Sequence, residues 1–128
     1  MGQTSIPVMK LEQREGVWVA TLREPLLLDE STAREIELRL LEITRQEQNP
    51  RLIVDFSRVE QVASSMLGTL ISVHRSAKDK RGQVRMVGVK GGVLEAVRLT
   101  YLDSMIPMAE SVAKALKSLG RDDGGSPE

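Results

Sequence analysis

The feature that most constrains the fold is an unbroken apolar run at residues 52–54, followed by Asp55 and Phe56. Asn49 and Pro50 provide a turn signal before the run, and Ser57 begins a polar connection after it. In a strand, successive side chains point to opposite faces of the sheet. A run without polar alternation is therefore typical of a strand covered on both faces. We expect this strand to lie centrally in a sheet that helices cover.

Further strands are predicted on both sides of this run. Residues 8–13 alternate between apolar and polar, and Gly16 separates them from a second apolar run at 17–22, which predicts a β-hairpin. Residues 84–89 have the composition of another strand. Residues 105–108 predict a short edge strand, because proline is tolerated at a sheet edge.

The first two helices are predicted between these strands. Thr32 and Glu35 have the spacing of a capping box, and the first helix should run from this segment to Gln48. Residues 65–81 predict a second helix that stops at Gly82. Its expected apolar face comprises Leu67, Leu70, Ile71, His74 and Ala77.

Two shorter helices complete the pattern. One is predicted at residues 93–99, and another is predicted to start after Ser111 as its cap and to stop at Gly120. The order of elements predicts a single α/β domain over residues 1–120, with a mixed sheet, made of the hairpin plus parallel strands, packed with about four helices. Residues 121–128 have no apolar residue to bury, so we expect a disordered tail.

Composition excludes several classes of function. The chain has 18 basic and 18 acidic residues and one each of Trp, Tyr and Phe, which disfavours nucleic-acid binding. It has no cysteine, a single histidine and scattered carboxylates, so no metal site is expected. No signal sequence and no apolar run long enough to cross a bilayer is present, which predicts a soluble cytoplasmic protein without membrane insertion.

The residues offer little for catalysis, so we do not expect an enzyme. Ser64 and the only histidine, His74, are ten positions apart, about 15 Å along a helix, too far for a nucleophile and its base. A nucleotide site built from the loop 88–92 with Asp29 is an alternative, but the loop matches neither phosphate-binding fingerprint, and its glycines suit a turn. No cofactor is therefore expected. A basic cluster could face an acidic partner or simply be solvated: Arg75, Lys78, Lys80, Arg81 and Arg85.

One candidate site remains, the pair Ser64 and Ser65 at the expected start of the second helix. A phosphoryl group there would lie near free backbone N–H groups and the positive end of the helix dipole. The alternative is that the serine only caps the helix.

The segment 52–68 resembles the STAS domain of bacterial anti-sigma factor antagonists. In that family an apolar strand ending in Asp, an apolar residue and Ser leads into Asp-Ser-Ser or Asp-Ser-Thr and then a glycine-containing helix. Here the corresponding residues are Asp55 to Ser57 and Ala63 to Gly68. The similarity extends over roughly residues 8 to 119, including Leu28-Asp29 at the start of the first helix.

The resemblance implies a non-catalytic regulator of transcription that binds an anti-sigma factor with serine-kinase activity. Phosphorylation of the first serine of the motif, Ser64 rather than Ser65, would release the partner, and a serine phosphatase would reset the switch. Asp29 matches an acidic residue close to the family's phosphorylation site. The partner surface that the resemblance implies comprises Asp29, Ala63, Ser64, Ser65, Met66 and Leu67.

Two positions depart from the family motif. Ala63 replaces an acidic residue that would orient the serine or be recognised by a kinase, and Met66 replaces a glycine, adding an adaptable apolar side chain at the expected partner surface. An alternative reading is therefore a constitutive interaction module of the same fold, without phosphoregulation, in a stress-signalling or lipid-transport assembly.

Overall fold

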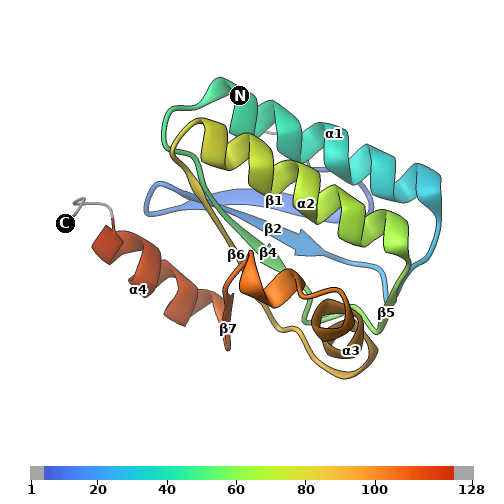
Figure 1. Cartoon of the computed structure of the whole chain (residues 1–128). Coiled ribbons are helices and arrows are strands. Elements are labelled where there is room, and N and C mark those ends of the chain that lie inside the picture. The colour runs from blue at the N-terminus through green and yellow to red at the C-terminus, as the bar shows by residue number, and fades with distance from the viewer. Residues whose placement is uncertain (1–4, 123–128) are drawn as a thin grey trace.

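Five strands form the main sheet of the computed structural model, which describes residues 5–122 (Figure 1). In spatial order they are β1 (Met9–Arg14), β2 (Val17–Leu22), β4 (Arg51–Asp55), β6 (Gln83–Val87) and β7 (Met108–Ala109). β1 and β2 are antiparallel, and every other neighbouring pair is parallel. The predicted hairpin and the central position of the apolar run are both confirmed.

Helices cover both faces of this sheet. α1 (Glu30–Gln46) and α2 (Ser64–Asp79) lie side by side on one face, and α4 (Val112–Asp122) lies on the other (Figure 1). α3 (Gly91–Leu99) packs at one end of the sheet and leads through a short 3-10 helix, Leu102–Ser104, to β7. The predicted α/β class, with a mixed sheet and four helices, is confirmed.

The central strand separates two apolar cores. Leu52 and Val54 face the larger core, beneath α1 and α2, whereas Ile53 faces the smaller one, beneath α4. All three side chains are fully buried. The unbroken apolar run therefore follows from burial on both faces, as the sequence predicts.

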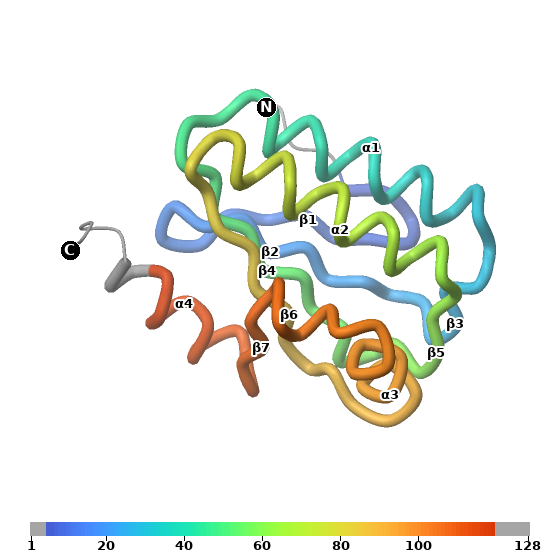
Figure 2. Tube along the Cα trace, in the orientation of Figure 1, coloured from blue at the N-terminus to red at the C-terminus, as the bar shows by residue number. Residues whose placement is uncertain are grey.

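A second, two-stranded sheet lies at the end of the molecule where α1 and α2 begin (Figure 2). β3 (Leu26–Leu27) and β5 (Gln61–Val62) run parallel, and the Ala63 N–H continues the pairing by donating to the Leu27 carbonyl at 2.9 Å. Each strand leads directly into a helix, so the pairing holds the starts of α1 and α2 next to each other. These strands are not predicted from the sequence, because two residues are too few to show a period.

Several predicted helix limits need correction. α1 begins at Glu30 with Asp29 as its N-cap, so the capping box of Thr32 and Glu35 is wrong. α4 is capped by Ser111, as expected, but continues through Gly120, so this glycine does not stop the helix. The predicted tail lies outside the described residues except for residues 121 and 122, which belong to α4.

The predicted inner face of α2 and the start of the edge strand also differ from the structure. α2 buries Met66, Leu70, Val73 and Ala77, whereas Ile71 and His74 lie on its partly exposed flank. β7 begins only at Met108, because Met105 is the C-cap of the 3-10 helix and Ile106 is a buried anchor in the bend that follows.

Candidate functional site

The candidate site is the first turn of α2, beside the first turn of α1 (Figure 2). α2 starts at Ser64, and Ala63 occupies its N-cap position without a capping side chain. The expectation that a serine caps this helix is therefore wrong. The first N–H groups of a helix have no partner one turn earlier. At the start of α2 the Ala63 N–H donates to the Leu27 carbonyl and the Met66 N–H to the Ala63 carbonyl at 3.0 Å, so the N–H groups of Ser64 and Ser65 remain as donors at the positive end of the helix dipole. Ser64 itself is exposed at this position.

The two serines differ in accessibility. Ser65 is partly buried, and its hydroxyl oxygen is inaccessible and has no hydrogen-bond partner among residues 5–122. It lies against a cavity of about 470 Å³ between the first halves of α1 and α2. The other residues that line this cavity are Glu30, Ser31, Ala33, Arg34, Glu37 and Thr69. A large enzyme acting from solvent would reach the hydroxyl of Ser64 and not that of Ser65.

Asp29 is engaged in capping α1. Its carboxylate accepts hydrogen bonds from the Thr32 N–H at 3.1 Å, from the Thr32 hydroxyl at 3.0 Å and from the Ser31 hydroxyl. These bonds, first from Ser31 and then from Thr32, hold the pKa of Asp29 below its ordinary value. Through the pairing of β3 with β5, this ionised carboxylate lies at the same end of the molecule as Ser64.

Met66 and Leu67 belong to the predicted partner surface, but the structure buries both side chains; for Leu67 this agrees with its predicted place on the apolar face of the helix. Met66 is 0% exposed and Leu67 is 8% exposed, so both side chains belong to the core. The prediction that Met66 presents an adaptable apolar group to a partner is therefore wrong. Two residues after Ser64 along a helix the side chain has turned by about 200°, which points Met66 at the sheet.

Two exposed leucines beside the site escape the sequence analysis. Leu26 is 53% exposed and Leu28 is 50% exposed, whereas Leu27 between them is buried. This alternation follows from the strand geometry of β3, in which neighbouring side chains point to opposite sides. Because Leu27 pairs with Val62, directly before Ala63, these leucines lie close to the start of α2. The run of three leucines conceals the alternation in sequence.

The single histidine, His74, is too far from Ser64 to act as its base. His74 lies on α2, ten positions after Ser64 along one continuous helix, which corresponds to about 15 Å. Burial, followed by the nearby charges of Lys78 and Arg75, lowers the pKa of His74. The histidine is therefore neutral at physiological pH.

The glycine loop before α3 serves close packing. A Cβ on Gly88 would lie 2.7 Å from the Ser57 nitrogen, and one on Gly92 would lie 2.9 Å from the Glu60 oxygen. Gly88 also has a φ of +69°, a backbone conformation that glycine adopts without strain. The predicted turn-forming role of these glycines agrees with this geometry.

Within residues 5–122, no helix is long and apolar enough to cross a membrane. The same residues contain no group of three or more side chains of the kinds that bind metal ions.

Comparison with known proteins places this arrangement in a family. Residues 8–115 match the STAS domain, so the chain belongs to the STAS domain family. A search of curated proteins finds no match.

Solved structures share the fold at low sequence identity. An anti-sigma-factor antagonist (STAS) domain protein from Planctomyces limnophilus is 18% identical, with a TM-score of 0.81 over 88% of this chain and 97% of that chain. An anti-sigma factor antagonist from Mycobacterium paratuberculosis is 23% identical, with a TM-score of 0.76 over 91% and 99%. The Bacillus cell fate determinant SpoIIAA in its phosphorylated form is 16% identical, with a TM-score of 0.66 over 86% and 97%.

Proposed function

We propose that this protein is an anti-sigma factor antagonist that binds an anti-sigma factor kinase through the starts of α1 and α2 and is released when Ser64 is phosphorylated. The observation that carries the proposal is an exposed serine at the first position of an uncapped helix. STAS family membership and the structural neighbours named as anti-sigma factor antagonists support the same function. One of these neighbours, SpoIIAA, is known in a phosphorylated form.

The geometry favours a phosphate on Ser64 over one on Ser65. Phosphate oxygens at the first turn would accept hydrogen bonds from the N–H groups of Ser64 and Ser65 and lie at the positive end of the α2 dipole. The helix could therefore hold the phosphate without rearranging. The hydroxyl of Ser65, in contrast, is buried against the cavity between the helices.

Release of the partner would follow from the chemistry of the surrounding surface. Leu26 and Leu28 provide exposed apolar contacts there, in the role that the sequence analysis gives to Met66. A phosphoryl group would add about two negative charges next to these leucines. Its charge would also add to that of the ionised Asp29 carboxylate at this end of the molecule. Desolvating this charge against an apolar partner surface would weaken the complex.

The proposal assigns the phosphoryl-transfer chemistry to the partner. The kinase would bring ATP and magnesium, a serine phosphatase would remove the phosphate, and this chain would act as a non-catalytic regulator in the bacterial cytoplasm. Ser64 would be the acceptor, and Asp29, Ala63 and Leu28 would surround it.

A second candidate function is a constitutive interaction module of the same family. The observation that favours it is Ala63, which occupies the N-cap position where the family motif has an acidic residue. In such a module the same surface would bind a partner whether or not Ser64 carries a charge.

The test combines phosphorylation with binding. We expect the protein, incubated with ATP and an anti-sigma factor kinase from the same organism, to gain the mass of one phosphate, and Ser64→Ala to gain none. Ser64→Asp and Leu28→Asp should each weaken partner capture by at least about tenfold, since each places a charge in the proposed apolar contact. Intact-mass measurement and quantitative pull-down provide the readouts.

Leu99→Asp is the matched control, because Leu99 is exposed at the last residue of α3 and is not one of the residues of the proposed contact surface. It should be captured as well as the original protein. Phosphate on Ser64→Ala would refute the assignment of the acceptor. Loss of capture with Leu28→Asp but not with Ser64→Asp would favour the constitutive module.

A further inference from the structure

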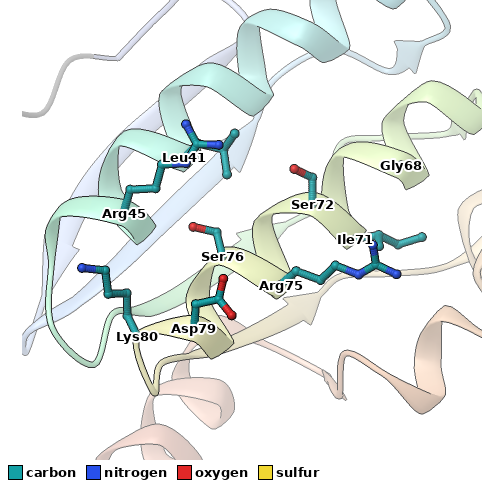
Figure 3. A pocket seen from close by; sticks show the side chains of 9 residues that line it. All are labelled: Leu41, Arg45, Gly68, Ile71, Ser72, Arg75, Ser76, Asp79 and Lys80. Carbon is teal, nitrogen blue, oxygen red and sulfur yellow. The ribbon is translucent and has the colours of Figure 1, made fainter.

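A basic groove runs between the second halves of α1 and α2, on the side that faces away from the sheet (Figure 3). It has a volume of about 420 Å³ and is separate from the site around Ser64. The residues that line it are Leu41, Arg45, Gly68, Ile71, Ser72, Arg75, Ser76, Asp79 and Lys80. Figure 3 shows Ser72 and Ser76 pointing from α2 into the space opposite Leu41 and Arg45 of α1.

Hydrogen bonds between the two halves of the groove preform it. The buried Thr44 hydroxyl of α1 donates to the Ser76 hydroxyl of α2 at 2.8 Å. Beyond the helix ends, the Asn49 N–H donates to the Lys80 carbonyl at 2.9 Å. A ligand would therefore meet a surface that needs little reorganisation, which reduces the entropy cost of binding.

The groove has a net positive charge. Arg45, Arg75 and Lys80 line it, against the single carboxylate of Asp79. Within residues 5–122, none of these three cations forms an ion pair. Glu42, the nearest carboxylate on α1 in sequence, instead pairs with Arg39 at 3.6 Å.

Stabilisation of helix ends explains only part of this arrangement. Arg45 lies in the last turn of α1, where the exposed carbonyls favour a cation. Arg75 lies more than one turn before the end of α2, so the same reason does not apply to it. Leu38, which is 51% exposed, lies three positions before Leu41, a spacing that puts both side chains on one side of α1. An exposed leucine on the α1 side of the groove, together with the cations that line it, gives this face both apolar and charged character.

We propose that this groove docks an acidic helical segment of a partner protein. Its carboxylates would pair with Arg45, Arg75 and Lys80, and its apolar side chains would contact Leu38 and Ile71. From Gly68 to Lys80 the groove spans twelve residues of chain, about 18 Å or three helical turns, a length that suits a helix.

Asp79 and the carbonyl ends of the two helices disfavour a compact polyanion such as a free phosphate ester. Carboxylates spaced along a helix can instead avoid these negative groups and still meet the three cations. Because Ser64 begins α2 and the groove occupies its later turns, this contact is independent of the switch proposed above.

The test uses the labelled protein and a synthetic probe of about 15 residues, long enough to form a helix. The probe carries Glu and Leu along one face of an alanine background, and a matched probe carries Gln in place of Glu. We expect saturable shifts of backbone amide resonances in residues 38–45 and 68–80 with the Glu probe only. Raising the salt concentration should weaken the interaction.

Matched variants provide the decisive comparison. The double variant Arg45→Gln with Arg75→Gln should bind the Glu probe with an affinity about three- to tenfold lower, the range for two exposed ion pairs. Arg98→Gln, on the exposed end of α3, and Ser64→Asp should leave the affinity unchanged. Arg45→Glu with Arg75→Glu should instead favour a probe that carries Lys.

Equal binding of the Glu and Gln probes, shifts outside the groove, or an unchanged affinity of the double variant would overturn the proposal. The proposal would also be overturned if the Glu probe showed no saturable binding. Amide spectra of each variant report its folding directly, so a loss of binding through unfolding is recognised.

Discussion

At the scale of single residues, Gly82 is required by close packing and not by its backbone angles. The left-handed conformation at the end of α2 belongs to Arg81, with a φ of +63°, and not to the glycine. A Cβ on Gly82 would instead lie 2.2 Å from the Pro50 carbonyl oxygen. The loops after α1 and α2 approach so closely here that only a hydrogen atom fits.

Gly82→Ala should therefore destabilise the protein. The added methyl group must displace backbone atoms, and overpacking of this kind costs about 1–3 kcal/mol. Urea unfolding monitored by circular dichroism measures the change.

Gly68→Ala is the matched control, because a Cβ there meets nothing within 4 Å. Gly68 lies inside α2, so this variant should gain roughly 0.5–1 kcal/mol through helix propensity. A stable Gly82→Ala protein would show that the two loops can separate at low cost.

The same scale shows which parts of the candidate site the sequence could predict. The position of Ser64 at a helix start follows from the local pattern and agrees with the structure. The burial of Met66 does not, because two overlapping sets give similar apolar faces in sequence: the predicted Leu67, Leu70, Ile71, His74 and Ala77, and the buried Met66, Leu67, Leu70, Val73 and Ala77. Only packing against the sheet decides which of the two faces inward.

At the scale of elements, the cap of α1 depends on the ionisation of one side chain. The pKa of Asp29 is lowered in the folded protein by hydrogen bonds from Ser31 and Thr32. Its contribution to stability is therefore fully present above the ordinary carboxyl pKa of 3.8 and is lost as the pH falls through the lower, folded value.

Asp29→Ala should consequently lower the free energy of unfolding at neutral pH and make little difference in strong acid. Denaturant unfolding of both proteins at about pH 7 and at about pH 2 gives the comparison. Asp29→Asn, which keeps a capping oxygen without the charge, should retain most of the stability at both pH values. A deficit of Asp29→Ala that is equal at the two pH values would contradict a role for the ionised cap.

Element boundaries also show where tertiary structure overrides local signals. The sequence places α4 correctly up to Gly120 but ends it there, because glycine commonly terminates helices. The prediction of an edge strand starts three residues early, since nothing local distinguishes the buried anchor Ile106 from a strand residue.

At the scale of the whole molecule, stability depends on two cores separated by one sheet. The smaller core consists of Val17, Val19, Ile53, Val87, Ala115 and Leu119, and α4 supplies the last two. Without this helix, the apolar residues of β2, β4 and β6 on that face would be exposed to water. The unbroken apolar run at residues 52–54 is sufficient to predict that this second face is covered.

Leu119→Ala should therefore cost about 2–5 kcal/mol, although Leu119 lies near the end of α4, because its side chain is 0% exposed. Leu99→Ala, at a leucine that is 75% exposed, should change stability by less than about 0.5 kcal/mol. Thermal unfolding of the two variants measures both effects. Equal melting temperatures would mean that α4 contributes little to the folded state.

The pairing of β3 with β5 has a consequence for how this molecule can change over evolution. It fixes two chain lengths at once, from Leu27 to the start of α1 and from Val62 to the start of α2. Inserting or deleting one residue in either connection would rotate one helix by about 100° relative to the other. Such a change would turn Ser64 away from its surface while every residue type stayed the same. Variation in these two connections is thus restricted to substitutions that keep their length.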